Sequence, residues 1–196
     1  MGAASPTTDS HPVSISLRKL RLRAVWLLII PFYYFATPSS STLALGVALG
    51  SVGLTIRAWA AGSIEKDREL ATNGPYAYTR NPLYLGSFFL GLGVTAVVGQ
   101  WVFMVLFLTF YLSVYRATAL REEAALEQAF GEPYRTYSAA VPFFVPRFSP
   151  YRTSTETRDA ARGFSVAQYV RNREWEAGLG ALAGYGVLVL KMVLLG

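Results

Sequence analysis

Two stretches of the chain gather residue types that could bind a charged ligand. The first, Arg68–Gly86, places Arg, Glu, Asn and several Tyr side chains around the turn signal Gly74-Pro75. Within it, Asn81-Pro82 predicts a helix start, because Asn is a favoured N-cap and Pro suits the first helical position. The partial positive charge of such a start, with Arg80 beside it, favours an anionic group such as a carboxylate.

The second stretch follows a long apolar run and is rich in carboxylates. Glu123 and Glu127 are four residues apart, so they would share one face of a helix continuing from that run, whereas Glu122 is rotated off this face. Carboxylates near a membrane surface could receive a cationic ligand group. Both stretches also have an explanation without a ligand. The first could be an interfacial anchor, because Tyr, Arg and Pro are common at membrane boundaries. The second could be a solvent-exposed helix end with charges of both signs.

The residue inventory excludes several kinds of site. The chain has no cysteine, so it has neither a disulfide framework nor a thiolate metal site. Its only histidine, His11, lies in a polar N-terminal tail, which excludes a Ser-His-Asp triad and a histidine-clustered metal site. Chemistry must therefore use Glu, Asp, Arg, Tyr or backbone groups, and we expect no metal.

Apolar runs would position the two stretches. The chain is 53% hydrophobic and 15% charged, against about 25% charged residues in ordinary soluble domains. Its apolar runs are Leu22–Ala36, Thr42–Ile64, Leu83–Val98, Trp101–Tyr115 and Ala177–Leu195. A soluble bundle would need polar faces on its outer helices, and the second and fourth runs lack them. The sequence therefore predicts an all-α, polytopic membrane helical bundle of about five transmembrane helices.

The basic residues predict the orientation of this bundle. If the five spans alternate, 17 of the 18 Lys and Arg residues fall on one side, and only Lys191 lies elsewhere. The intervening loops, Thr37–Ser41 and Gly99-Gln100, carry no charge. The positive-inside rule then places the N-terminus and both stretches in the cytoplasm. The net charge of +6 is thus explained by anionic lipid and orientation rather than by nucleic acid.

We expect one membrane domain, residues 1–196. Its parts are a cytoplasmic tail (1–21), the first two spans (22–64), a cytoplasmic loop (65–82), a helical hairpin (83–115), a cytoplasmic segment (116–176) and the last span (177–195). The basic residues at 18–23 would anchor the first span, and Thr153–Arg162 would be a loop or a surface helix. Because the hairpin is tight, its cytoplasmic ends should lie close together. The two stretches would then face each other and could hold an amine, an acid and an aromatic ring system.

The ordered motifs resemble those of the isoprenylcysteine carboxyl methyltransferase family, and the related phospholipid methyltransferases look similar. They are Gly74-Pro75-Tyr76, Arg80-Asn81-Pro82-Leu83-Tyr84-Leu85-Gly86, then Glu122-Glu123 after a hairpin, and Phe130-Gly131-Glu132-Pro133-Tyr134. The match covers about Arg68 to Pro146. It implies a membrane enzyme that uses S-adenosylmethionine without a soluble Rossmann fold. The cofactor would lie at the cytoplasmic side, and a lipophilic small acceptor would enter from the bilayer.

The resemblance also implies roles for individual residues. Glu122 would receive the methionyl ammonium, and Tyr76 or Tyr84 would face the adenine or the sulfonium. Arg116 is the nearest match to an arginine on the family's acceptor side and is predicted as the catalytic residue, holding an acidic acceptor group; Arg147 is a second candidate. The implied cofactor contacts are Arg68, Glu69, Leu70, Ala71, Tyr76, Arg80, Asn81, Pro82, Leu83, Tyr84 and Glu122.

One departure from the family pattern and several alternatives stay open. The family's histidine is Asn81 here, which cannot titrate. A carboxylate acceptor needs no base, whereas an amine would have to lose a proton to a carboxylate or a Tyr. The acceptor (carboxylate, quinone-like, isoprenoid, fatty or phospholipid) and the oligomeric state are open. Two other functions are also open. One is an NADPH-dependent membrane reductase, in which Arg68 and Arg80 would bind the 2′-phosphate of NADPH. The other is a non-catalytic membrane scaffold.

Overall fold

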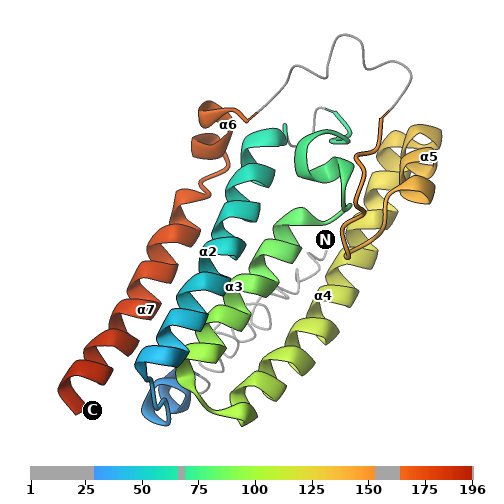
Figure 1. The fold of residues 1–196 in the computed structure, drawn as a ribbon. Helices are drawn as coiled ribbons and strands as arrows, with labels where there is room; N and C mark the ends of the chain where they lie inside the picture. The colour runs from blue at the N-terminus through green and yellow to red at the C-terminus, as the bar shows by residue number, and fades with distance from the viewer. Residues whose placement is uncertain (1–28, 66–68, 153–163, 196) are drawn as a thin grey trace, which may run out of the picture. The chain divides into compact units, whose positions relative to one another are not determined.

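A computed structural model describes residues 29–65, 69–152 and 164–195, and every regular element within these ranges is helical (Figure 1). The all-α prediction is therefore confirmed. The elements are α2 (Ser40–Ser63), η1 (Gly74–Ala77), α3 (Pro82–Val98), α4 (Trp101–Phe130), α5 (Glu132–Ala140), α6 (Val166–Arg171) and α7 (Trp175–Leu195). The predicted basic anchor at 18–23, Arg68 and the polar stretch Thr153–Arg162 lie outside the described residues.

The chain divides into two compact units, Met1–Phe35 and Ala36–Gly196. The described part of the first unit is residues 29–35, which contain a short helix over 29–34 inside the predicted first span. Its last turn is closed by the Phe35 backbone N–H, which donates to the Pro31 carbonyl at 2.9 Å. The second unit holds the elements from α2 to α7.

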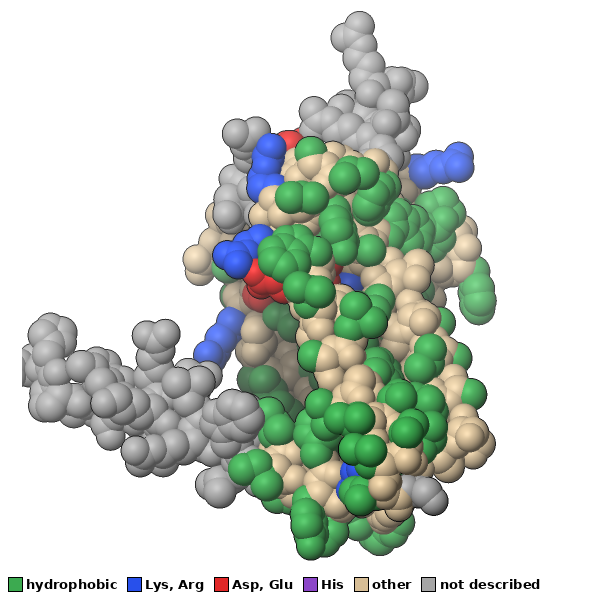
Figure 2. Space-filling view, turned by 90° about the vertical axis from the view of Figure 1, so that its left-hand side faces the viewer, with side chains coloured by type: hydrophobic (Ala, Val, Ile, Leu, Met, Phe, Trp, Pro, Cys, Tyr) green, Lys and Arg blue, Asp and Glu red, His purple; other side chains and the backbone are tan. Residues whose placement is uncertain are grey.

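Three described helices, α2, α4 and α7, are long and apolar enough to cross a membrane, and α3 is a shorter apolar helix. They correspond to the second to fifth apolar runs. Large apolar side chains point outward from them, for example Leu106 on α4 and Leu182 on α7, at 53% and 71% exposure. Hydrophobic side chains cover much of the described surface in Figure 2, and the acidic side chains lie in its upper half. Lipid is the medium that suits such a surface.

Glycines let α2 and α3 pack with their backbones close together. A Cβ atom on Gly53 of α2 would lie 2.5 Å from the Gly86 carbonyl oxygen of α3, and one on Gly93 would lie 2.5 Å from the Gly46 carbonyl oxygen. Tyr185 of α7 packs against the same groove, and its hydroxyl donates to the Gly46 carbonyl at 2.8 Å. Small residues at helix interfaces are the usual device for close packing in membranes.

The turn between α3 and α4 was predicted as Gly99-Gln100, and the structure confirms it. Gly99 has a φ of 73°, a left-handed conformation that favours glycine. From this turn α3 and α4 diverge (Figure 1). α4 continues for 30 residues, well past its apolar part, and so carries the carboxylates of the second stretch, as the sequence predicted.

Candidate functional site

One cavity of about 780 Å³ lies where α3 and α4 have diverged. Its walls come from the end of α2, the segment after it, η1, the start of α3, the charged part of α4, and α5. All the predicted cofactor contacts that the structure describes line it: Glu69, Leu70, Ala71, Tyr76, Arg80, Asn81, Pro82, Leu83, Tyr84 and Glu122. The prediction that the two stretches face each other is confirmed. Arg116 is exposed on α4 and does not line this cavity.

Carboxylates outnumber guanidinium groups in the described cavity wall. The charged lining residues are Glu65, Glu69, Glu122, Glu123, Arg57 and Arg80. Each arginine is already neutralised by its own partner. Arg57 binds Glu174 through two nitrogens, one of them Nη2 at 3.0 Å from Oε2, and Arg80 pairs with Glu123. The described lining is therefore complementary to a ligand that carries positive charge.

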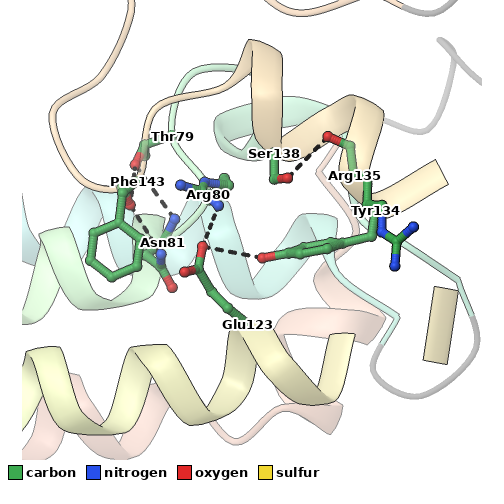
Figure 3. A network of polar contacts seen from close by, with 8 residues as sticks. All are labelled: Thr79, Arg80, Asn81, Glu123, Tyr134, Arg135, Ser138 and Phe143. Atoms are coloured by element: carbon green, nitrogen blue, oxygen red, sulfur yellow. Dashed lines mark hydrogen bonds and ion pairs between the residues drawn. The ribbon is translucent and has the colours of Figure 1, made fainter. Parts of the chain in front are cut away.

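Figure 3 shows how Arg80 is held at the start of α3. Its guanidinium donates to Glu123 of α4, and that carboxylate also accepts the Tyr134 hydroxyl of α5 at 3.2 Å. The guanidinium carbon lies 5.4 Å from the centre of the Phe143 ring, which adds a cation–π contact. Three chain segments thus meet at one guanidinium, and this fixes one wall of the cavity.

Asn81 occupies the predicted N-cap position of α3, with Pro82 in the first turn, but its side chain makes no cap hydrogen bond. The side-chain amide instead donates to the Phe143 carbonyl at 3.0 Å. The Asn81 side chain therefore leaves the first turn of α3, which borders the cavity, without its usual cap. Backbone donors at this helix start suit an anionic group.

Glu122 faces the start of α3 from the opposite wall. The Tyr84 hydroxyl donates to it at 2.7 Å. Tyr84 is itself oriented by α4, because the Tyr111 hydroxyl donates to its carbonyl at 2.5 Å and the Tyr115 ring packs against its ring with centroids 4.9 Å apart. The carboxylate is thus positioned, and it keeps lone pairs that can accept further hydrogen bonds.

Two polar atoms of the cavity residues are buried and have no hydrogen-bond partner among the described residues, Tyr76 Oη and Arg80 Nε. Burial raises the pKa of Tyr76, and the nearby carboxylates of Glu122 and Glu174 raise it further, so the phenol stays a neutral donor. The Tyr137 hydroxyl fixes this residue by donating to its carbonyl at 2.8 Å. Buried polar groups normally have partners, so these two atoms fit a site that a polar ligand completes.

Sequence reasoning assigned no binding role to several lining residues, chiefly Arg57, Ser87 and Tyr137. Arg57 had a usable signal, because an ionisable residue inside an apolar span commonly faces the protein interior. Its side chain passes over Gly86, where a Cβ would lie 2.5 Å from the Arg57 Cγ, and its guanidinium donates to Ser87. Tyr137 gave no comparable signal, because its role follows from how α5 folds back onto η1.

Comparisons with known proteins agree with this geometry. Residues 41–133 match the phospholipid methyltransferase family model. The chain is 32% identical over 120 residues to the protein-S-isoprenylcysteine O-methyltransferase of Schizosaccharomyces pombe, an alignment covering 59% of this chain and 51% of that protein. It is 33% identical over 171 residues to the cobalt-zinc-cadmium resistance protein CzcN of Cupriavidus metallidurans, covering 76% of each.

A third relative is the nickel-cobalt-cadmium resistance protein NccN of Alcaligenes xylosoxydans xylosoxydans, at 32% identity over 113 residues, 57% of this chain and 51% of that protein. The chain spans about half the length of this relative and of the yeast enzyme. No solved structure gave a significant match. Within residues 29–65, 69–152 and 164–195, no group of three or more His, Asp or Glu side chains could hold a metal ion.

Proposed function

Because this chain belongs to the family of isoprenylcysteine carboxyl methyltransferases and phospholipid methyltransferases, we propose that it is an integral membrane methyltransferase that uses S-adenosylmethionine and acts on a small lipophilic acceptor. The observation that carries the proposal is the single cavity in which the matched motifs meet, with Glu122 of α4 opposite the start of α3. The group that accepts the methyl in the proposed reaction is a carboxylate or another lipid head group.

The described residues fit this cofactor. A volume of about 780 Å³ lies in the usual range for small-molecule sites, about 300–1,000 Å³. Glu122 would receive the ammonium, and the uncapped start of α3 together with Arg80 Nε would receive the carboxylate. Tyr76, Tyr84 or both would lie against the adenine or the sulfonium, whose charge is attracted to an aromatic face. The surplus of carboxylates in the described lining favours this cation and opposes a phosphate-rich dinucleotide.

The bound cofactor supplies a methyl group, which the acceptor takes as the carbon–sulfur bond breaks and the electron pair stays on sulfur. The chain's own residues would orient both reactants and exclude water. Arg116 stays a prediction for holding an acidic acceptor, and so does Arg147; Arg116 is exposed outside the cavity. From the distribution of basic residues, we propose that the N-terminus and the cavity face the cytoplasm.

Isothermal titration of the detergent-purified full chain tests the cofactor. We expect saturable binding of S-adenosylmethionine and S-adenosylhomocysteine, and no binding of NADPH. Binding of NADPH alone would replace the proposal with a membrane reductase. If none of the three binds, the chain would instead be a scaffold that keeps the fold without turnover.

A further inference from the structure

A segment without regular secondary structure follows α5, and we call it the strap (Val141–Tyr151). It is tied by its backbone to the residues before α3. The Arg147 N–H donates to the Tyr78 carbonyl at 2.9 Å, and the Tyr151 N–H donates to the Ala77 carbonyl at 2.9 Å. The Arg80 N–H donates back to the Pro142 carbonyl at 3.0 Å. The strap is therefore a fixed part of the fold at the place where α3 and α4 diverge (Figure 1).

The Phe144 side chain of the strap reaches between the two helices. The Phe144 ring lies 5.7 Å from the Phe88 ring of α3 and 5.1 Å from the Tyr115 ring of α4, measured between centroids. Phe88 is ten residues before the end of α3 at Val98, which at 1.5 Å per residue is about 15 Å from the turn that joins the helices. A hydrocarbon core is about 30 Å thick. Tyr115, the nearer of the two rings, is 14 residues after the start of α4 at Trp101, which is about 21 Å from the same turn. With this turn at one membrane surface, the Phe144 ring lies between half and about two thirds of the way across the core. The Phe144 carbonyl accepts from Thr79 at 3.0 Å, so the backbone of the strap lies at the level of the start of α3.

The composition of the strap suits that depth. Its first six residues, Val141–Pro146, are all apolar, and two of them are prolines without an N–H to satisfy. The carbonyls of Phe143 and Phe144 accept hydrogen bonds from side chains at the start of α3, namely Asn81 at 3.0 Å and Thr79 at 3.0 Å. Irregular backbone at membrane depth is tolerated where the protein satisfies its polar groups in this way.

One side of the strap packs inward, and the other is exposed in the part of the chain that the structure describes. Phe144 is half-buried against α3 and α4, while the next residue, Val145, is 73% exposed. Val145 therefore faces away from the helices, at the level of the Phe144 backbone. A large apolar side chain exposed at that level, within the hydrocarbon core, suits contact with acyl chains.

We propose that the strap is a re-entrant membrane segment that enters the bilayer between α3 and α4, with Val145 in contact with lipid acyl chains. The strap then forms a wall between the bilayer and the cavity, because Asn81 and Arg80, which line the cavity, hold Phe143 from the other side. Part of the segment expected in the cytoplasm, 116–176, thereby lies at membrane depth. This assignment does not depend on the chain being a methyltransferase.

Spin-label accessibility in phospholipid vesicles tests the proposal. The chain has no cysteine, so Val145→Cys can be labelled without background in the full-length protein. Two matched variants at exposed positions calibrate the scale, Leu106→Cys on the apolar part of α4 and Thr136→Cys on the polar helix α5. The measured quantity is the ratio of relaxation by oxygen, which concentrates in lipid, to relaxation by a water-soluble nickel chelate.

We expect the ratio at residue 145 to lie on the Leu106→Cys side of the midpoint between the two calibrants. A ratio on the Thr136→Cys side would place the strap in water and overturn the proposal. Because Val145 packs against nothing that must move, loss of fold is not an expected outcome, and circular dichroism of the labelled protein verifies this. Phe148→Cys, at an even more exposed position, gives a second reading nearer the end of the strap, where we expect a ratio between the calibrants.

Discussion

Glu122 is already positioned by a phenol, and this decides what a ligand gains from it. The Tyr84 hydroxyl donates to one carboxylate oxygen at 2.7 Å, so an incoming ammonium finds an oriented acceptor and loses little entropy in fixing it. Replacing the carboxylate by an amide removes the charged partner of that ammonium. We expect Glu122→Gln to weaken binding of S-adenosylhomocysteine by about 2 kcal/mol, roughly 30-fold, as for hydrogen bonds to charged groups.

Glu127→Gln is the matched control for this measurement. It lies on the same helix, but its carboxylate is bound to Arg135 at 2.8 Å on the exposed side and does not line the cavity. We expect its affinity in the same titration to stay within about twofold of wild type, since exposed ion pairs contribute little. Equal affinities for wild type and Glu122→Gln would refute the role given to Glu122.

Tyr76 separates stability from binding. Its hydroxyl is buried without a partner among the described residues, so removing it should not destabilise the free protein. We expect Tyr76→Phe to keep or raise the thermal unfolding midpoint, yet to weaken S-adenosylhomocysteine binding about tenfold, the contribution of one hydrogen bond. Tyr137→Phe is the contrasting variant: its hydroxyl bonds the Tyr76 carbonyl, so its loss should lower the midpoint. A lowered midpoint for Tyr76→Phe would mean that the hydroxyl already has a structural partner.

The same phenol predicts a pH dependence. Burial raises the pKa of Tyr76 in the folded protein above the unfolded value of about 10. The preference for the neutral form therefore stabilises the fold fully below about pH 10 and is lost as the pH rises toward the folded pKa. We expect wild type to lose stability relative to Tyr76→Phe above about pH 10, measured as unfolding midpoints from pH 8 upward. Parallel curves would show that Tyr76 ionises normally.

The α2–α3 pair is the element on which the cavity rests, because Arg57 and the start of α3 are positioned by it. At Gly53, a Cβ would meet the Gly86 carbonyl oxygen at 2.5 Å and the Leu90 nitrogen at 2.6 Å. These are backbone atoms and cannot move independently. We expect Gly53→Ala to destabilise the protein by roughly 1–3 kcal/mol, measured as a lower unfolding midpoint in detergent. Gly180→Ala in α7, where a Cβ meets nothing within 4 Å, should be neutral or slightly stabilising.

Most of the helices could be predicted from the sequence, because apolar runs and turn residues are local signals. Gly99-Gln100 separates the apolar run that forms α3 from the run that forms α4. No helix breaker stands between Trp101 and Gly131, so the continuation of α4 through Glu122 and Glu127 could be predicted. Once the hairpin was recognised, the meeting of the two charged stretches followed from geometry.

The rest could not be predicted, because it depends on which side chains meet across elements. Asn81 is a good N-cap by type. Its side-chain amide donates instead to the Phe143 carbonyl of the strap, and its side chain makes no cap hydrogen bond. The position of Arg57 inside an apolar span indicates that it faces the protein interior, but its partner Glu174 is far away in sequence and is seen only in the structure. The depth of the strap likewise appears only when Phe144 is seen against Phe88 and Tyr115.

At the scale of the whole second unit, the α3–α4 turn and the cavity lie toward different ends of the helices (Figure 1). The start of α2 and the α3–α4 turn share one end, because the Thr37 N–H donates to the Val98 carbonyl at 2.9 Å and Gln100 bonds Thr37 at 3.1 Å. The cavity, the charged part of α4, and α5 lie at the other end (Figure 1). Ser41 and Thr136, both exposed, therefore report on opposite ends.

These two positions test the orientation that the basic residues predict. If the cavity end is cytoplasmic, a membrane-impermeant maleimide added to intact cells should label Ser41→Cys and leave Thr136→Cys unlabelled until the membrane is opened. The reverse pattern would keep the spans and invert the orientation, leaving the cavity outside the cytoplasm. Labelling of both positions in intact cells would be the more serious result, because α2, α3 and α4 would then not separate the two ends by a membrane. The absence of cysteine elsewhere in the chain means that each labelled band reports one position alone.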